Sequence, residues 1–509
     1  MMKKYIDEKQ YGDIFSTLQI LVGITPNNVK YMANTPSERF NKDFAFNWQV
    51  KEEDDRGVSR YRTVRQWKEF ARRFLSIPMA HQMATSFMIL DGTKTKETLK
   101  VMRPYQVEAT RKVIEALKRT DFELGTNKLG YIWHTTGSGK TITSFKTAWL
   151  ASRLPNVDKV VFLVDRVNLT NQTRDEYRAY DPEHIEDNIE GESALGSVQD
   201  TKNTRALGRR LKDKSSSIIV TSIQKMDTLV KRRSFKSPDK NIVFIVDEAH
   251  RSTNGNSFVA IQNAFKRAAW IGYTGTPMVK DTAKETYTQD VFGPCLHSYT
   301  IRDAIRDQNV LGFKVDFETT IDQEAMKEKY LPEFYHAQHP DWSNEKIKEK
   351  IANLTPEDMD DAVQPSFYDE NPDHIQLVVE DVFKNWKNRS NDSKYNALLT
   401  TRVGGGKAST PMAMMYFDAF QKKNQELKEQ GRTDDCLKVA VTFADSTNHS
   451  DHSLESNKGL HRAMMAYNDE FGTKFGMSDV SEYTDDVVDR LKKTADDGKY
   501  LDLVIVVDQ

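Results

Sequence analysis

Two short motifs in this 509-residue sequence carry side chains that could hold phosphate groups and a divalent cation. The first is WHTTGSGKT, residues 133–141, which follows an apolar run and precedes an amphipathic one, so we expect a loop between a strand and a helix. Backbone N–H groups of such a loop bind phosphate, a lysine neutralises phosphate oxygens, and a hydroxyl ligates Mg²⁺. The predicted site residues are Thr136, Gly137, Ser138, Gly139, Lys140 and Thr141, with Lys140 as a catalytic residue and Thr141 as a metal ligand. The first glycine of the usual phosphate-loop pattern would fall at position 134, where this chain has His134.

The second motif is DEAH, residues 247–250, directly after the apolar run 241–246. Carboxylates at the C-terminal end of a buried parallel strand lie at the edge where α/β proteins bind ligands. We expect Asp247 and Glu248 to be catalytic, with Asp247 holding Mg²⁺ and Glu248 polarising an attacking water, and His250 to complete the nucleotide site. A lone Asp-Glu pair at a strand end is more often a helix cap; the presence of Lys140 in the same predicted sheet favours the nucleotide site.

These two motifs together resemble those of superfamily-2 helicase and translocase motors, and the resemblance implies ATP and Mg²⁺ as cofactors. The segment RPYQ at 103–106 resembles the one in which a glutamine reads adenine, which adds Arg103 and Gln106 to the expected ATP-binding residues. The segment YTGTP at 273–277 resembles the motif that couples hydrolysis to domain movement. Residues 164–166 and 221–224 follow strands where such motors contact the nucleic-acid backbone. Each of these four segments alone fits a turn or cap better, and only their order and spacing support the motor.

The amino-acid sequences of four segments narrow the resemblance to one family of these motors. Residues 132–141, 162–166, 247–252 and 272–277 closely resemble the restriction (R) subunit of type I restriction-modification enzymes. That resemblance extends well over 98–300 and moderately over 300–509, and His134 suits this family; residues 11–90 are similar to its segment between nuclease domain and motor. It implies an ATP-dependent motor that moves along double-stranded DNA, partnered by separate methylation and specificity subunits, in the cytoplasm of a bacterium or archaeon.

Two parts of that activity have no clear counterpart in the sequence. The family's Asp…Glu-x-Lys nuclease pattern has one superficial match, residues 7–9, which we interpret as a solvated helix end, so we predict that this chain does not cut DNA. In such motors the arginine fingers that speed hydrolysis come after a strand that residues 502–509 resemble, and no residue of this sequence follows that strand. We therefore expect nucleotide binding with slow hydrolysis at best. Arg402 could substitute, although a surface arginine is the interpretation that we favour.

Two further clusters imitate functional sites, and two other functions remain open. The run Gly404–Lys407 resembles a phosphate loop, but Ala408 follows where a hydroxyl is needed, so we favour a flexible loop. The basic cluster of Lys231, Arg232, Arg233 and Lys236 could touch phosphates, and a solvated loop is the default interpretation. The alternatives to the restriction motor are another superfamily-2 DNA or RNA helicase and a nucleotide-regulated scaffold that docks partner subunits without productive turnover.

The sequence predicts that strands and helices alternate around these residues, as in an α/β protein. Apolar strand candidates at 131–133, 160–164, 218–221, 242–246 and 269–274 alternate with amphipathic stretches, and others follow at 396–400, 438–443 and 503–507, which predicts parallel sheets covered on both faces. We therefore expect tandem RecA-like domains preceded by a small α/β N-terminal block. The expected divisions are 1–95, the tail of a nuclease-type domain with its linker, 96–305, the ATP-binding domain, and 306–509, a second domain with an insertion at about 321–390 and a truncated C-terminus.

Composition narrows the class of protein. The 73 lysines and arginines against 75 acidic residues give a net charge of −2, which excludes a globally basic nucleic-acid binder but not a local basic track. The only two cysteines, Cys295 and Cys436, form no CxxC pair, so a disulfide scaffold and a thiolate zinc site are excluded. No stretch approaches 18 uninterrupted apolar residues, so we expect no membrane partner.

Overall fold

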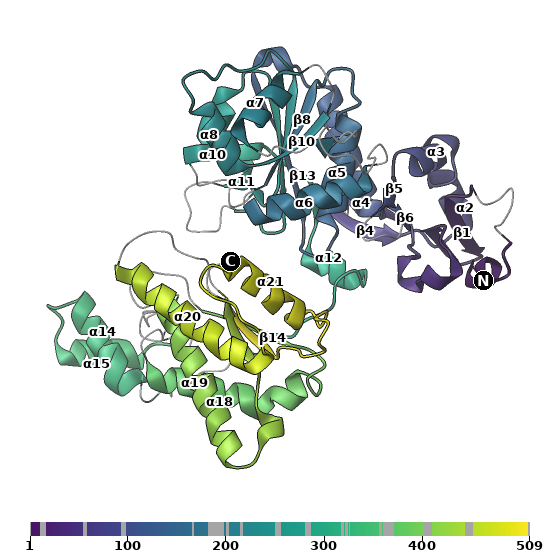
Figure 1. Ribbon diagram of the computed structural model, residues 1–509. Helices are drawn as coiled ribbons and strands as arrows, with labels where there is room; N and C mark the ends of the chain where they lie inside the picture. Colours follow the sequence, from purple (N-terminus) through teal and green to yellow (C-terminus); the bar gives the residue numbers. More distant parts are fainter. Residues whose placement is uncertain are drawn as a thin grey trace. The chain divides into compact units, whose positions relative to one another are not determined.

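The chain divides into two compact units, Met1–Phe313 and Lys314–Gln509, and each is described by itself. Figure 1 shows their elements in a computed structural model. The structure describes residues 2–10, 17–53, 59–92, 98–164, 167–181, 198–199, 203–213, 217–249, 256–279, 287–316, 320, 324, 326–355, 359, 371–401, 410–442 and 451–506. Among these residues, no helix is both long and apolar enough to cross a membrane.

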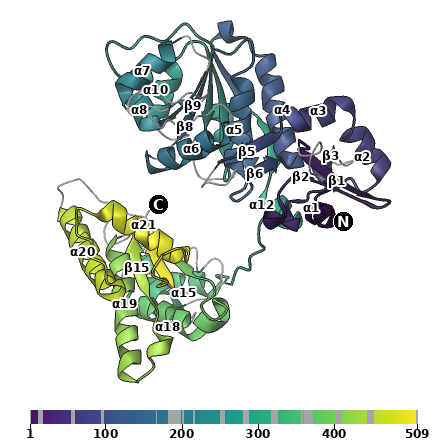
Figure 2. The same ribbon diagram turned by 45° about the vertical axis from the view of Figure 1, so that its right-hand side comes forward.

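The first unit begins with a block of short helices and three antiparallel strand pairs, which we call the N-terminal block (residues 2–101; Figure 2). The pairs are β1 (Ile20–Thr25) with β2 (Asn28–Ala33), β3 (Gln49–Glu53) with β4 (Ser59–Thr63), and β5 (Met88–Asp91) with β6 (Thr98–Val101). Its helices are α1 (Met2–Asp7), α2 (Trp67–Arg73) and α3 (Ile77–Thr85). Tyr31, Trp48, Phe70 and Phe74 are buried in its core.

A seven-stranded parallel sheet forms the centre of the first unit, in the order β13-β7-β12-β11-β8-β10-β9. Its strands are β7 (Thr126–His134), β8 (Lys159–Val164), β9 (Val198–Gln199), β10 (Ser217–Ser222), β11 (Ile242–Val246), β12 (Ala268–Thr274) and β13 (Cys295–Tyr299). All five strands predicted for this region are present. The edge strand β13 was not predicted, because CLHSY interleaves polar residues and lacks a continuous apolar run.

Helices cover both faces of this sheet, as predicted for a parallel α/β fold. One face packs against α4 (Pro104–Lys118), α5 (Lys140–Ala151), α6 (Val167–Tyr180) and the N-terminal block in a single apolar core. The other face packs against α7 (Thr204–Lys212), α8 (Ile223–Val230), α10 (Asn256–Ala264) and α11 (Thr288–Phe292). Figure 1 shows the two helix groups on opposite sides of the strands. A short helix, α12 (Ile301–Arg306), follows β13. The prediction of an α/β fold with a parallel sheet is confirmed.

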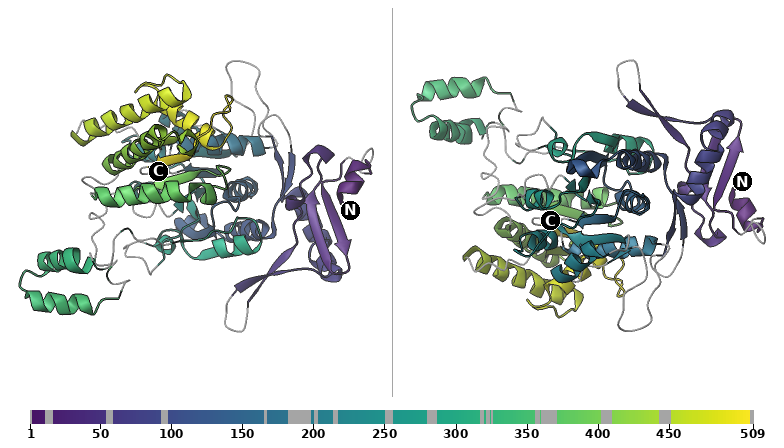
Figure 3. Two further views of the ribbon diagram at one scale, coloured as in Figure 1. Left: turned by 90° about the horizontal axis from the view of Figure 1, so that it is seen from below. Right: turned by 90° about the horizontal axis from the view of Figure 1, so that it is seen from above.

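The second unit contains a smaller parallel sheet, which the described residues form in the order β14-β16-β15. Its strands β14 (Ala397–Thr400), β15 (Val439–Thr442) and β16 (Leu503–Val506) match the three predicted strands. The helices α18 (Pro372–Arg389), α19 (Thr410–Glu429), α20 (Asp451–Phe471) and α21 (Val480–Leu491) share an apolar core with it. A π-helical turn (Met326–Tyr330), α14 (Leu331–Gln338) and α15 (Asn344–Ala352) pack on one another around a separate small cluster (Figure 3).

Candidate nucleotide-binding site

The loop between β7 and α5 has the backbone of a phosphate loop. Gly137 has φ +77° and Gly139 has φ +79°, a left-handed conformation that favours glycine. A Cβ at Gly139 would lie 2.7 Å from Nε2 of Gln106, so a larger residue there would displace the Gln106 side chain. Thr136 and Gly137 are exposed, Ser138 is buried, and Lys140 is the first residue of α5. The predicted strand–loop–helix arrangement of this motif is therefore present.

The helix α4 holds this loop from behind. The hydroxyl of Tyr105 donates to the carbonyl oxygen of Ser138 at 2.5 Å, and Nε2 of Gln106 donates to the carbonyls of Ser138 at 3.2 Å and Gly139 at 3.3 Å. Oε1 of Gln106 accepts from the backbone N–H of Arg103 at 2.9 Å, which caps α4. Gln106 thus lies at the phosphate loop, with its amide engaged by the protein.

The acidic motif meets the phosphate loop at the C-terminal edge of the sheet. Asp247 and Glu248 directly follow β11, which β12 separates from β7. Nζ of Lys140 lies 3.9 Å from Oε1 of Glu248, and these side chains are 13% and 32% exposed. Glu248 has φ +46°, an uncommon conformation for a non-glycine residue and one that clusters at functional sites. The two sequence motifs therefore converge on one place.

Asp247 is a half-buried carboxyl group that lacks a strong positive partner in this site. Burial and the neighbouring charge of Glu248 raise the pKa of Asp247 to about 6, while the N–H of Glu248, which donates to Oδ1 at 3.0 Å, and Lys140 oppose the rise. A bound divalent cation would favour the ionised form and relieve this penalty. No group of three or more His, Cys, Asp or Glu side chains suited to a metal occurs among the described residues. One carboxylate and the hydroxyl of Thr141 fit the sparse protein ligation that Mg²⁺ takes when phosphates supply the rest.

The motif at 273–277 borders the same loop. Nε1 of Trp133 donates to the carbonyl oxygen of Gly275 at 3.0 Å. A Cβ at Gly275 would lie only 3.3 Å from Nζ of Lys140. The hydroxyls of Tyr273 and Thr147 are 2.8 Å apart in the core. The 273–277 segment therefore lies against the phosphate loop, beside the side chain of Lys140.

Of the remaining predicted residues, those that the structure describes are not joined to this site. Ser222 caps α8, accepting from the N–H of Lys225 at 3.2 Å, the alternative that a lone motif of this kind favours. In the predicted basic cluster, Lys231 caps the C-terminus of α8 and pairs with Asp227 at 2.6 Å. The other three members, Arg232, Arg233 and Lys236, are exposed. Asp7, the start of the superficial nuclease match, ends α1 and accepts from the Ser37 hydroxyl. His250, residues 165–166, Arg402 and residues 404–407 lie outside the described residues.

A cavity beside the phosphate loop was missed by the sequence analysis. It has a volume of about 300 Å³ and lies between the N-terminal block and the loop. Its lining includes Phe44 and Phe46, together with Arg103, Gln106, Ser138 and Gly139. The guanidinium of Arg103 lies 4.8 Å from the ring centre of Phe46. No local sequence pattern connects these aromatic side chains to the loop, because tertiary packing alone brings them there.

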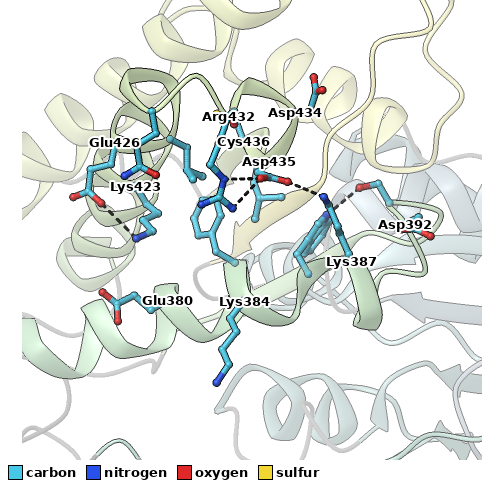
Figure 4. A pocket seen from close by; sticks show the side chains of 16 residues that line it. Glu380, Lys384, Lys387, Asp392, Lys423, Glu426, Arg432, Asp434, Asp435 and Cys436 are labelled. Atoms are coloured by element: carbon cyan, nitrogen blue, oxygen red, sulfur yellow. Dashed lines mark hydrogen bonds and ion pairs between the residues drawn. The ribbon is translucent and has the colours of Figure 1, made fainter.

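The second unit has a larger hollow, of about 740 Å³, at the opposite, amino-terminal end of β15 (Figure 4). Several of its charged side chains pair with one another: Lys387 and Arg432 each pair with Asp435 at 2.8 Å, and Lys423 pairs with Glu426 at 3.4 Å. Because parallel sheets bind ligands at their carboxyl ends, this hollow is not a counterpart of the phosphate-loop site.

Comparison with known proteins gives consistent results over most of the chain. A family model for the SWI2/SNF2 ATPase matches residues 105–348, and a model for type I restriction enzyme subunit R domain 3 matches residues 393–509. A type I restriction enzyme endonuclease subunit of Staphylococcus aureus (strain MRSA252) is 31% identical over 99% of this chain and 48% of its own length. The chain thus spans about half the length of the curated relatives it matches in full.

A shorter relative is covered almost completely. The C-terminal part of the type I restriction enzyme MpnIIP endonuclease subunit of Mycoplasma pneumoniae is 38% identical, over 39% of this chain and 93% of that protein. Among solved structures, an ATP-dependent Type ISP restriction-modification enzyme, LlaBIII bound to DNA, matches 99% of this chain and 33% of that chain, at 12% identity and a TM-score of 0.40.

Proposed function

We propose, from the premise that this chain belongs to the family of type I restriction enzyme endonuclease subunits, that it forms the ATP-driven part that moves along duplex DNA. The observation that carries the proposal is the approach of Lys140 Nζ to within 3.9 Å of Glu248, beside the half-buried carboxyl of Asp247. A cation, a carboxylate pair and a glycine loop at one sheet edge are what phosphoryl transfer to water requires. The proposed cofactors are ATP and Mg²⁺.

The residues have separate tasks in this mechanism. The N–H groups of the loop at 136–141 bind the β-phosphate, and Lys140 turns from Glu248 to the phosphate oxygens. Thr141 and Asp247 are the residues that would hold Mg²⁺, which when bound neutralises charge on the phosphates. Glu248 is the carboxylate that would orient the attacking water and accept its proton.

The cavity of about 300 Å³ beside the loop is the proposed place of the adenine. Its aromatic and apolar walls with a few polar groups suit a planar heterocycle. Arg103 and Gln106 line it, and Gln106 carries both a donor and an acceptor for the base edge. Binding there requires the Gln106 amide to exchange a loop carbonyl, now 3.2–3.3 Å away, for the base.

The proposed partners follow from the family. Contacts to duplex DNA would be made mainly to phosphates, so without sequence readout, and the methylation and specificity subunits would supply modification and site choice. The proposed location is the bacterial or archaeal cytoplasm. No nuclease role is proposed for the exposed Asp7–Lys9 segment, and cleavage is assigned to a site not found in this sequence.

Nucleotide binding and ATP turnover by the purified chain, with and without long linear duplex DNA, test this function. Lys140→Ala is expected to weaken nucleotide binding about 10- to 100-fold, as the loss of a charge-assisted contact predicts, and to abolish DNA-stimulated turnover. Lys350→Ala, an exposed lysine on α15, serves as the control and should behave as the unaltered chain. Equal affinity in Lys140→Ala would refute the proposal.

The same assay separates the alternatives. Stimulation by forked or single-stranded nucleic acid in place of long duplex would favour a strand-separating helicase. Turnover that ignores DNA, together with tight binding to a methyltransferase core, would favour a scaffold.

A further inference from the structure

A chain of three side chains connects the N-terminal block to the first position of the phosphate loop. The hydroxyl of Tyr61, on β4, is hydrogen-bonded to Nε2 of His297, on β13. Nδ1 of His297 lies 3.0 Å from Nε2 of His134, which ends β7 and opens the loop. Both histidines are buried, at 0% and 1% exposed for His134 and His297. The chain thus crosses the edge strand of the sheet to reach the loop from the side of the N-terminal block.

The surroundings of His134 fix its ring but give it a single polar contact. The rings of Tyr105 and Tyr299 stack at 3.6 Å, and Tyr105 meets His134 edge-on at 5.3 Å. Backbone pairing holds the same place, since the N–H of Thr135 donates to the carbonyl oxygen of Tyr299 at 3.0 Å. Nδ1 of His134 has no hydrogen-bond partner within the part of the chain that the structure describes. His297 is therefore the polar group that orients this imidazole.

Both imidazoles are neutral at ordinary pH. Burial lowers the pKa of His134 to about 3 and lowers that of His297 well below its usual range, and nearby positive charge, Lys140 for His134, acts in the same direction. A neutral imidazole has one N–H and one acceptor nitrogen. The Tyr61 hydroxyl, with the Glu108 carboxylate 4.0 Å from the same Nε2, thus sets the tautomer of His297, which sets that of His134 in turn.

We propose that Tyr61 and His297 are positioning residues for nucleotide binding, through which the N-terminal block sets the conformation of the phosphate loop by way of His134. The inference rests on the proposed function and adds the control of that site by a separate part of the unit. A glycine, the usual residue at position 134, has no side chain to receive this contact. In this proposal, His134 replaces the common glycine because its side chain receives the contact from His297.

Nucleotide affinity of the full chain, measured by calorimetry with ADP, tests the proposal. Tyr61→Phe removes one hydroxyl and is expected to weaken binding about three- to tenfold, the effect of one lost hydrogen bond. Tyr483→Phe is the matched control, because that buried hydroxyl donates to the backbone carbonyl of Val441 at 2.8 Å in the second unit. Thermal unfolding of both variants reports whether their losses of stability are equal.

A second variant separates positioning from general destabilisation. His297→Asn keeps a polar atom near the place of Nδ1, facing His134, and removes the nitrogen that contacts Tyr61. Its affinity should fall as in Tyr61→Phe, and adding Tyr61→Phe to it should have no further effect.

The outcomes distinguish this proposal from the function on which it rests. If the unaltered chain binds ADP and Tyr61→Phe binds it as tightly as Tyr483→Phe does, the positioning role is refuted while the nucleotide site stands. If Tyr61→Phe and His297→Asn each weaken ADP binding and their effects multiply in the double variant, the proposed coupling from Tyr61 through His297 to His134 would likewise be refuted. If the unaltered chain does not bind ADP and Lys140→Ala makes no difference, the proposed function fails and the positioning role fails with it.

Discussion

At the scale of single residues, burial decides the behaviour of the ionisable groups near the loop. Asp247 follows β11 and His134 ends β7 of the same sheet, and burial shifts both pKa values toward the neutral form, upward for the acid and downward for the base. For Asp247 the raised pKa means that the ionised carboxylate is disfavoured unless a cation binds beside it. For His134 it secures a neutral ring that can accept or donate one hydrogen bond.

The shift at His134 predicts a loss of stability in mild acid. The pKa is about 3 in the folded chain and 6.5 in the unfolded one, so below pH 6.5 the unfolded state takes up a proton that the folded state does not. The free energy of unfolding should fall by about 1.4 kcal/mol per pH unit from this residue, or about 2 kcal/mol between pH 7 and 5. The groups facing His134 are His297, Tyr105, Tyr299 and Lys140.

Urea unfolding of the unaltered chain and of His134→Asn, each at pH 7 and pH 5, measures this contribution. Asparagine does not titrate, so the pH dependence of His134→Asn should be smaller by about 2 kcal/mol. Equal pH dependence of the two chains would show that His134 is not a buried neutral group.

At the scale of elements, the site depends on how closely α4 and the loop approach. Gln106 and Tyr105 on α4 donate to the loop carbonyls, and a side chain at Gly139 would displace the Gln106 amide from this contact. The strand order places β7 and β11 on either side of β12, which brings Lys140 to Glu248. Element geometry, more than any single contact, thus assembles the site.

Gly139→Ala tests this close approach against a matched glycine. Both Gly139 and Gly431 have left-handed backbones, φ +79° and +74°, so alanine should cost about 1–2 kcal/mol of stability at each. Only at Gly139 would the new Cβ meet Gln106, at 2.7 Å, since nothing lies within 4 Å of it at Gly431. We expect nucleotide affinity to fall more than tenfold in Gly139→Ala and to be unchanged in Gly431→Ala. Similar affinities in a binding titration would contradict this account of the loop.

At the scale of the whole molecule, every contact described at the candidate site comes from the first unit. The phosphate loop, the acidic motif, the N-terminal block and the hydrogen-bonded histidines all precede Phe313. The second unit has its own parallel sheet and apolar core. The proposed nucleotide binding is therefore separable in principle from the proposed translocation, because a step along DNA would require two units that change their separation.

A fragment of residues 1–313 tests this separation. It should unfold cooperatively and bind ADP, with the binding lost in Lys140→Ala, because its core and site are complete within the unit. Turnover stimulated by duplex DNA, which the sequence predicts to be slow at best, is expected only from the full chain. Fluorescence titration and an ATPase assay on both proteins make the comparison. A folded fragment that binds no ADP would place essential binding groups beyond Phe313.

The sequence by itself predicted the candidate chemistry and determined the pattern of the strands. Apolar runs located the strands, glycine spacing located the phosphate loop, and the position of Asp247 after a strand placed it at the binding edge, since these signals are local in the chain. Only the tertiary structure decided which distant residues complete the site. Tyr61, His297 and the aromatic wall at Phe44 carry no local signal of their role, because their meeting with the loop depends on packing between segments far apart in sequence.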